Sequence, residues 1–367
     1  MVYPVRGRDR TVRGWDRCAH QQKGRSVSAL AMQVDAPGAQ LQPAHVPVTS
    51  PSQGWVRVRV VASGMCGADL GTADPDPDAR FPVTPGHEVA GTVAELGPDV
   101  PGWQVGDRVA VGWFGGSCGH CPACRRGDLV HCPERRIPGI SYPGGWAESI
   151  TVPAQALARV PDALDLFDAA PLGCAGVTTF NAVRHCGAPA GGHIAVLGLG
   201  GLGHLAVQFA RAMGYEVTVI TRGSERADLA RQLGATHYLD STQEPVARAL
   251  QAVGGVDAAI STAPTTAPLP DLLDGLGTRG RLVLLGVTGH SVDVPVGPLV
   301  MNARTVMGHV TGTPSDTEQA MQFAVTNQVR PVRQCLPLES APEALERLRT
   351  GQARLRLVLD ATAERHG

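Results

Sequence analysis

A glycine-rich turn directly after a buried strand constrains the fold of this chain more than any other feature. The apolar run Ile194–Leu197 leads into a GxGxxG turn made of Gly198, Leu199, Gly200, Gly201, Leu202 and Gly203. After the turn, apolar residues recur on one helical face as far as Met213. Such glycines permit the tight turn, the approach of backbone to a pyrophosphate and close packing of helix on strand. The segment therefore predicts a dinucleotide-binding strand–turn–helix unit.

Strand and helix patterns alternate along the middle of the chain. Apolar runs at Val217–Ile220, Ala258–Ile260 and Leu282–Leu285 have the composition of buried strands, with helical patterns between them. This alternation predicts an α/β domain with a doubly wound parallel sheet. Residues 29–160 instead alternate with period two, as in Trp55–Val61, between many glycines and prolines. This pattern of short alternating segments predicts a mostly-β domain with a barrel-like or sandwich architecture.

The end of the second strand predicts which dinucleotide is bound. An NAD site places Asp or Glu there, about 20 residues after the glycine turn, to bind the ribose 2′-hydroxyl. This chain has Thr221 and Arg222 at that position, followed by Ser224 and Arg226. Hydroxyl and guanidinium groups accept a 2′-phosphate that a carboxylate would repel. We therefore expect NADP(H); NAD is the alternative if Arg222 is only a solvated surface residue.

Four cysteines predict a metal-binding lobe at residues 115–135. Their spacing is CxxCxxC followed by seven residues and a fourth cysteine, at Cys118, Cys121, Cys124 and Cys132. Four thiolates at short spacing suit a closed, structural Zn²⁺ site. An iron–sulfur cluster is the main alternative, and disulfides are disfavoured because the total of nine cysteines is odd. We expect neither His120 nor His131, which lie inside the lobe, to be a ligand.

Charge and composition exclude several classes of function. A formal net charge of −1 excludes a general nucleic-acid binder, and no apolar run is long enough to span a membrane. Residues 1–28 are basic, and we expect a disordered extension or an upstream start with the working protein beginning near Met32. A targeting arm or anion-binding tail is the alternative. Clustered thiols and the lack of an evident signal peptide predict a cytoplasmic location.

Three further residues have the chemistry of a catalytic metal site, but no spacing joins them. Cys66, His87 and Cys174 lie far apart in the sequence. Two cysteines and a histidine with a water are a known catalytic zinc arrangement. Taken singly, however, a buried cysteine or a structural histidine explains each of them equally well.

The order of the motifs resembles that of a known family. The segments are Gly86–Glu88, Val105–Val109, the four-cysteine lobe, Cys174–Thr178, the glycine turn and Leu285–Val287. Over roughly residues 30–362, the chain is similar to zinc-dependent alcohol dehydrogenases of the medium-chain dehydrogenase/reductase superfamily. It is most similar to their cinnamyl-alcohol-dehydrogenase-like branch of NADPH aldehyde reductases.

The resemblance implies a discontinuous domain organisation. A mostly-β, GroES-like catalytic domain, residues 29–172 and 313–367, would wrap around a doubly wound dinucleotide-binding domain, residues 173–312. In the tail after about residue 314, the local patterns predict one helix, at Ala341–Thr350, and one apolar strand, at Leu355–Leu359. Homo-oligomers, dimers or tetramers, are common among such proteins, and we expect a homodimer.

The resemblance also implies the catalytic metal site. Cys66, His87 and Cys174 would hold a catalytic zinc, so that each chain would carry two Zn²⁺ ions. Asp69 would hydrogen-bond the ligand histidine, and Glu88 would lie behind the metal. Zinc would polarise the substrate oxygen while a hydride passes between an alcohol or aldehyde and the nicotinamide.

Further positions match the family's substrate and cofactor contacts. The substrate pocket would include Trp113 and Phe114. Residues that would line the cofactor, besides the glycine turn and the second strand end, are Thr178, Thr262, Gly286, Val287, Gly308, His309 and Val310.

One departure from the family pattern concerns the proton. The usual motif after the first ligand has a hydroxyl and a histidine that relay the substrate proton to solvent, whereas this chain has Ala68 and Gly71. Water or Thr72 could replace the relay in an ordinary aldehyde or ketone reductase. The pocket could instead reduce an activated C=C or C=N bond, or the protein could bind zinc and nucleotide with poor turnover. Gly71 also leaves room for a bulkier substrate.

An alternative hypothesis from a different functional class is a zinc-ribbon-like interaction module joined to a nucleotide sensor. The four-cysteine lobe alone permits it. A sensor needs no open metal site, so Cys66, His87 and Cys174 favour the enzyme, whose partner would be a small alcohol or aldehyde.

Overall fold

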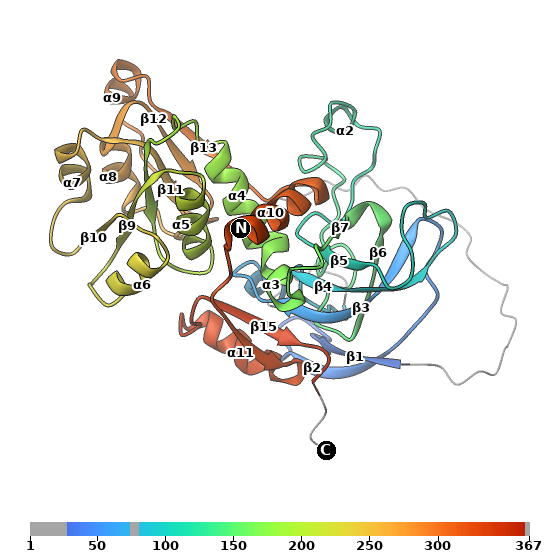
Figure 1. Cartoon of the computed structure of the whole chain (residues 1–367). Coiled ribbons are helices and arrows are strands. Elements are labelled where there is room, and N and C mark those ends of the chain that lie inside the picture. Colours follow the sequence, from blue (N-terminus) through green and yellow to red (C-terminus); the bar gives the residue numbers. More distant parts are fainter. Residues whose placement is uncertain (1–27, 74–80, 364–367) are drawn as a thin grey trace, which may run out of the picture.

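Two β-sheets dominate the computed structural model, which describes residues 28–73 and 81–363 (Figure 1). The basic extension expected at residues 1–28 therefore lies outside the described residues, apart from Ser28. Helices α4 (Val177–Arg184) and α10 (Pro314–Asn327) lie between the two sheets. Among the described residues, no helix combines the length and apolar character needed to cross a membrane.

The first sheet has six parallel strands in the order β10-β9-β8-β11-β12-β13. The strands are β8 (His193–Leu197), β9 (Glu216–Thr221), β10 (His237–Asp240), β11 (Val256–Ser261), β12 (Leu276–Leu284) and β13 (Thr305–Gly308). The accompanying helices are α5 (Gly203–Ala212), α6 (Ala227–Gln232), α7 (Val246–Ala252), α8 (Leu269–Asp274) and α9 (Val296–Met301). This is the predicted doubly wound sheet. Its order reverses between β8 and β11, so ligands are expected at the carboxyl ends of these strands.

The second sheet has seven strands and is mostly antiparallel. Its order is β14-β15-β3-β4-β5-β7, with β6 paired to β3. The strands are β3 (Trp55–Gly64), β4 (Val89–Leu96), β5 (Arg108–Val111), β6 (Ser149–Pro153), β7 (Leu157–Arg159), β14 (Arg333–Pro337) and β15 (Arg356–Asp360). Because β14 and β15 come from the end of the chain, the chain returns to this second sheet after it has completed the parallel one.

The remaining strands and helical segments are short and lie outside the two sheets. A separate hairpin is formed by β1 (Ser28–Gln33) and β2 (Gln42–Pro47). The helical segments are α1 (Asp69–Ala73), α2 (Pro122–Arg125), η1 (Ala154–Ala156), α3 (Leu166–Pro171), the π-helical turn η2 (Leu172–Gly176), η3 (Leu338–Ser340) and α11 (Ala341–Arg349). The mostly-β architecture predicted from the period-two pattern is confirmed.

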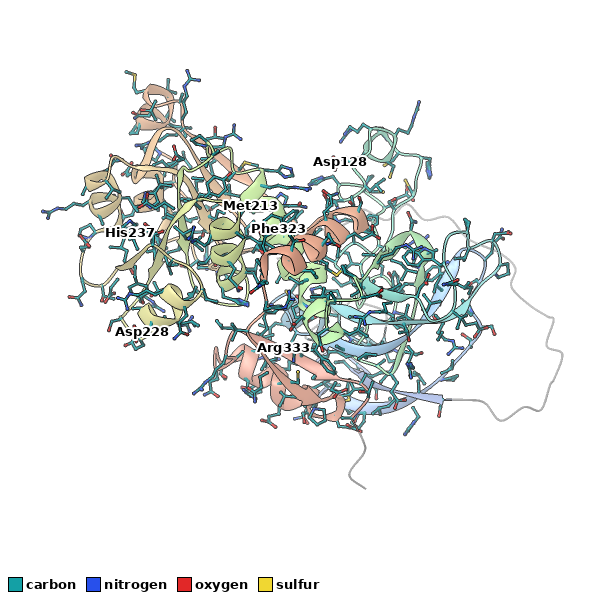
Figure 2. The ribbon with its side chains drawn as sticks, in the orientation of Figure 1. Asp128, Met213, Asp228, His237, Phe323 and Arg333 are labelled. Carbon is teal, nitrogen blue, oxygen red and sulfur yellow. The ribbon has the colours of Figure 1, made fainter. Side chains whose placement is uncertain are left out.

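One hydrophobic core runs between the two sheets. Phe180 of α4, Phe209 of α5 and Phe323 of α10 form an aromatic trio with ring centroids 5.4 to 6.0 Å apart. Figure 2 shows Phe323 in this central position. Buried residues of both sheets belong to the same cluster, including Ala62 of β3 and Ile194 of β8. Apolar burial therefore holds the helices against both sheets.

The prediction of a single helix in the tail was wrong. The structure adds α10 and the strand β14 to the expected α11 and β15. The buried face of α10 consists of Thr317, Ala320, Met321 and Ala324, so small residues hide its apolar periodicity. The sequence of β14 is RQCLP, and its burial does not alternate. Strand β12 also begins earlier than predicted, through glycines that carry no strand signal.

Candidate functional site

The structure brings together three residues that no sequence spacing connects. Cys66 lies between β3 and α1, His87 precedes β4, and Cys174 lies in the π-helical turn η2. Potential ligand atoms of these three residues and of Glu88 all lie within 4.8 Å of one another. A single insertion into a helix, of the kind that makes a π turn, is frequent at functional sites.

Asp69 holds two of these residues in place. Its Oδ1 lies 3.0 Å from His87 Nδ1, and its Oδ2 accepts a hydrogen bond of 2.8 Å from the Cys66 backbone N–H. Asp69 and His87 are both buried. With Nδ1 turned to the carboxylate, Nε2 is left as the free ring nitrogen, and it has no hydrogen-bond partner within the described part of the chain. This is the arrangement by which a carboxylate orients a metal-binding histidine.

The electrostatics favour a metal-binding thiolate. A hydrogen bond from the Cys174 thiol, together with His87, lowers the pKa of Cys66 well below its usual value despite burial. Burial opposes protonation of His87, but the charge of Asp69 raises its pKa well above the usual value. Two soft sulfurs and one imidazole nitrogen around a shared centre fit Zn²⁺ with an open fourth position.

A buried ion pair lies behind this centre. The Arg356 guanidinium of β15 contacts the Glu88 carboxylate, and both side chains are almost fully buried. Burial raises the pKa of Glu88 to about 7 even though Arg356 opposes the shift. Sequence reasoning missed Arg356. The available signal was an arginine inside the otherwise apolar run Leu355–Leu359.

Trp113 forms one side of the candidate metal centre. Its ring meets the His87 imidazole edge to face, with centroids 4.8 Å apart at 89°. Phe114, the next residue, is buried. Ala68 and Gly71 are exposed, and a Cβ added at Gly71 would meet no atom within 4 Å. The space of the usual relay histidine is therefore open.

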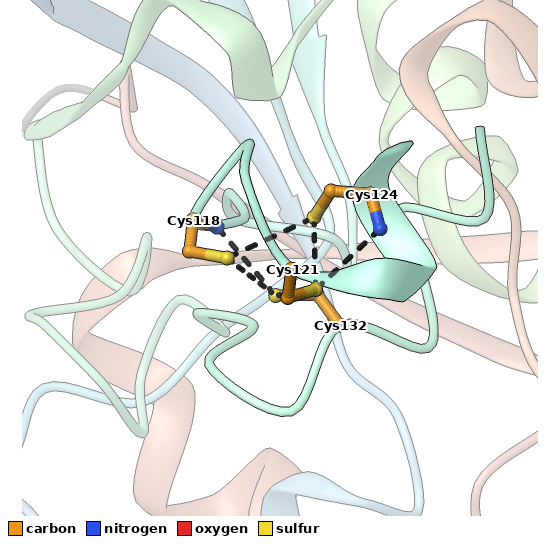
Figure 3. Close-up of side chains that lie close together, drawn as sticks. All are labelled: Cys118, Cys121, Cys124 and Cys132. Carbon is orange, nitrogen blue, oxygen red and sulfur yellow. Dashed lines mark hydrogen bonds between the residues drawn. The ribbon is translucent and has the colours of Figure 1, made fainter. Parts of the chain in front are cut away.

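The four cysteines of the lobe converge as a second group. Cys118, Cys121, Cys124 and Cys132 lie with Sγ atoms 3.5 to 4.0 Å apart (Figure 3). A zinc tetrahedron with Zn–S bonds of about 2.3 Å has sulfur–sulfur edges of about 3.8 Å. The four thiols therefore fit one closed ion. His131 instead contacts Asp128 at 2.6 Å, and the His120 ring lies 2.9 Å from the Cys118 carbonyl oxygen.

The glycine turn has the geometry of a phosphate-binding loop. Gly198 has a φ of 89°, which favours glycine. A Cβ at Gly203 would lie 1.9 Å from the Gly198 carbonyl oxygen, whereas one at Gly200 would meet open space. The turn leads directly into α5, and backbone N–H groups at such a helix start are the usual donors to a pyrophosphate.

Other predicted cofactor residues lie at the same edge of the sheet. Thr262 follows β11 and donates a 2.9 Å hydrogen bond to the Leu197 carbonyl. The residues at the ends of β12 and β13 are Gly286, Val287, Gly308, His309 and Val310, and Val287 and Val310 are exposed. Thr178 of α4 donates a 2.7 Å hydrogen bond to the carbonyl of the Cys174 backbone. This bond ties Thr178 to the backbone of a predicted metal ligand.

The residues at the end of β9 form more hydrogen bonds than the sequence predicts. The Thr221 hydroxyl contacts the Tyr238 hydroxyl, which also donates to the Gly223 carbonyl at 2.6 Å. Arg226 donates a 2.7 Å hydrogen bond to the Leu199 carbonyl and so lies over the glycine turn. Arg222 is exposed, as is Ser224. Tyr238 was not predicted, because a tyrosine on the next strand has no local signature.

Comparisons with known proteins agree with this geometry. Residues 52–162 match the alcohol dehydrogenase GroES-like domain, and residues 201–326 match the zinc-binding dehydrogenase family. An alcohol dehydrogenase from Penicillium expansum is 37% identical over 322 residues, which cover 88% of this chain and 94% of that protein.

Two solved structures are similar over nearly the whole chain. A cinnamyl alcohol dehydrogenase from Sorghum bicolor superposes with a TM-score of 0.83 at 30% identity, covering 93% of this chain and 99% of that one. A cinnamyl alcohol dehydrogenase from Helicobacter pylori, complexed with NADP(H), gives 0.83 at 27% identity, with 93% and 100% covered. The chain therefore belongs to the zinc-dependent alcohol dehydrogenases of the medium-chain dehydrogenase/reductase superfamily.

Proposed function

We propose that this alcohol dehydrogenase works as an NADPH-dependent aldehyde reductase, with Cys66, His87 and Cys174 holding a catalytic zinc. The observation that carries the proposal is the convergence of these three ligands within 4.8 Å. When bound, zinc supplies a Lewis acid for the substrate oxygen and the nicotinamide supplies the hydride. The zinc-ribbon sensor is not favoured, because it needs no such open set of donors.

The protein's own residues position the reactants. Asp69 fixes the His87 ring so that Nε2 faces the centre. Trp113 packs against the His87 ring and would exclude water from that side of the centre. Thr178, anchored on the Cys174 backbone, is placed to contact the nicotinamide. Holding donor and acceptor carbons in this way lowers the entropic part of the barrier.

The preference for NADPH rests on the end of β9. Thr221 ends this strand, and the exposed side chains of Arg222 and Arg226 follow it, so we expect these residues to meet the 2′-phosphate. The carboxylate at the end of β10 is already engaged by backbone N–H groups. Asp240 accepts hydrogen bonds from the Gly223 N–H at 2.8 Å and from the Thr242 N–H at 2.9 Å. The Helicobacter pylori relative complexed with NADP(H) agrees with this preference.

Water in the open space at Ala68 and Gly71 would carry the substrate proton. The double variant Ala68→Thr, Gly71→His tests this directly, because it rebuilds the usual relay. We expect a higher turnover and a changed pH profile. A rate equal to the parent's at every pH would show that the missing side chains are not limiting. The comparisons, which are to alcohol dehydrogenases, do not favour reduction of C=C or C=N bonds.

We further propose that the cysteine lobe holds a second, structural zinc and that the enzyme is located in the cytoplasm.

We also propose that the enzyme is a homo-oligomer. Strand β13 is the last strand of its sheet, and its exposed apolar neighbours Val296, Val300 and Met301 lie on α9. Unpaired strand edges beside apolar side chains favour association.

A substrate screen tests the proposed function. Purified enzyme would be assayed with aliphatic and aromatic aldehydes, with NADPH and NADH in parallel. We expect NADPH oxidation with at least one aldehyde class and two zinc ions per chain. Consumption of NADH alone would refute the assignment of cofactor, and a single zinc per chain would refute the catalytic site.

A further inference from the structure

Two side chains of α5 hold the connection by which the chain leaves α10 for β14. The Gln208 amide pairs with the backbone of Arg330, accepting its N–H at 3.1 Å and donating to its carbonyl at 3.0 Å. One turn earlier, His204 Nε2 accepts a 3.1 Å hydrogen bond from the Val332 N–H. On its other side the connection is anchored by Arg333, whose position is labelled in Figure 2. Arg333 forms an ion pair of 2.6 Å with Asp168 of α3.

The second nitrogen of His204 contacts the cofactor loop. Nδ1 lies 3.0 Å from the Gly200 carbonyl oxygen. Because Nε2 accepts from Val332, the proton is on Nδ1, which donates to Gly200. His204 is completely buried, and burial, aided by the nearby charge of Arg356, lowers its pKa to about 4. The neutral ring therefore bridges the loop and the crossing chain throughout the physiological range.

The bridge continues from Val332 to the candidate metal centre. The Val332 carbonyl accepts a 3.1 Å hydrogen bond from the Arg356 N–H. The Arg356 guanidinium contacts Glu88, whose carboxylate belongs to the ligand group with Cys66. Hydrogen bonds thus run without interruption from the glycine turn to the residues behind the metal centre.

We propose that His204 is a positioning residue that fixes the cofactor loop onto the strand carrying Arg356, and so sets the cofactor and the metal centre at a fixed spacing. This role rests on the proposed function, since it needs a dinucleotide at the glycine turn and a metal ion at Cys66, His87 and Cys174. Hydride transfer needs the reacting carbons at a near-attack distance, so a small displacement of one site relative to the other is costly.

Two variants break the bridge at different ends. In His204→Asn the amide can still reach Gly200 but is too short for Val332. In His204→Gln the longer side chain can still accept from the Val332 N–H, but it loses the hydrogen bond that Nδ1 donates to the Gly200 carbonyl oxygen. Each variant keeps one hydrogen bond and a side chain of similar polarity, so neither leaves both partners unpaired. His193→Asn is the matched control, because this partly buried histidine makes a 2.7 Å contact with Thr218 at the far end of β8.

Two readouts on the metal-loaded enzyme test the proposal. NADPH affinity would be measured by nicotinamide fluorescence, and zinc release to a chromogenic chelator would be followed without cofactor. We expect both His204 variants to bind NADPH about fivefold more weakly and to release one zinc about fivefold faster, the effect of losing one hydrogen bond. The His193→Asn variant would match the parent in both measurements.

Faster zinc release is the decisive result, since His204 touches no metal ligand. A parental release rate in both His204 variants, a parental NADPH affinity, or the same changes in His193→Asn would overturn the role assigned to His204. A parent enzyme that binds no NADPH or holds no chelatable zinc would instead refute the proposed function.

Discussion

Cys174 is the residue whose loss best separates the two proposed metal sites. A serine there removes a soft ligand from the catalytic site and leaves the cysteine lobe intact. We expect Cys174→Ser to lower kcat/KM at least about a thousandfold, because the Lewis acid is lost, and to lower the zinc content from two ions to one. Metal analysis and steady-state kinetics check both. The control is Cys335→Ser, an exposed cysteine; equal loss of activity there would contradict the assignment.

Arg226 is the residue that tests cofactor choice. Its guanidinium lies over the glycine turn, bonded to the Leu199 carbonyl. We expect Arg226→Glu to raise KM for NADPH about tenfold to a hundredfold, the effect of losing a charged hydrogen bond, and to change KM for NADH little. Arg231→Glu on α6, the helix that Arg226 precedes, is the control; Arg231 pairs with Asp228. An equal effect on both cofactors would argue against 2′-phosphate recognition.

The titration of His204 makes a prediction for stability. Its pKa is about 4 in the folded protein and about 6.5 in an unfolded chain. Between these values the unfolded state binds more protons, so stability is present above pH 6.5 and falls as the pH drops towards 4. From pH 7 to pH 5 the contribution of this group falls by about 2 kcal/mol.

Urea unfolding at the two pH values checks this prediction. The loss in the parent should exceed that in His204→Asn by about the same 2 kcal/mol, because asparagine does not titrate. An identical pH dependence in parent and variant would mean that the ring is not held neutral.

Individual residues of the site differ in how well the sequence predicts them. The cysteine lobe and the glycine turn have local spacing that follows from metal and phosphate chemistry. Cys66, His87 and Cys174 were joined by the resemblance, because contacts between distant segments leave no periodic signal. Tyr238 was missed for the same reason, since it acts through a partner on another strand. Arg356 did leave a local signal, a charged residue inside an apolar run.

At the scale of the elements, the packing of α4, α5 and α10 around three phenylalanines contributes to stability. Phe209 is completely buried and packs against Phe180 and Phe323. We expect Phe209→Ala to lower the free energy of unfolding by about 3–5 kcal/mol, measured by urea unfolding. Phe209→Leu, which keeps most of the volume, should cost less than about 1.5 kcal/mol. Equal losses in the two variants would show that packing is not the cause.

Elements whose apolar residues form a continuous run or a clear period could be predicted from the sequence, and elements without such a pattern could not. Strands β8, β9 and β11 are continuous buried runs, so the sequence locates them within a residue or two. Helix α10 has a capping box at Thr313 and Asp316, which is a local signal that sequence reasoning overlooked. Strand β14 has no such signal, because its position depends on parallel pairing with β15.

At the scale of the whole molecule, the edge at β13 predicts assembly. Val300 and Met301 are exposed apolar residues beside this strand. We expect the parent to sediment as a dimer or larger, and the double variant Val300→Glu, Met301→Glu to sediment as a monomer with an unchanged circular dichroism spectrum. Val253→Glu, at an exposed site on the loop after α7, is the control. A monomeric parent at micromolar concentration would refute the assembly.

The central claim is that Cys66, His87 and Cys174 bind one zinc ion at the crevice where the dinucleotide is held. A crystal structure of the NADPH complex, with anomalous data collected at the zinc absorption edge, tests it most directly. The claim predicts two peaks per chain, one of them about 2.0–2.3 Å from the two Sγ atoms and His87 Nε2. A single peak, in the four-cysteine lobe alone, would contradict it.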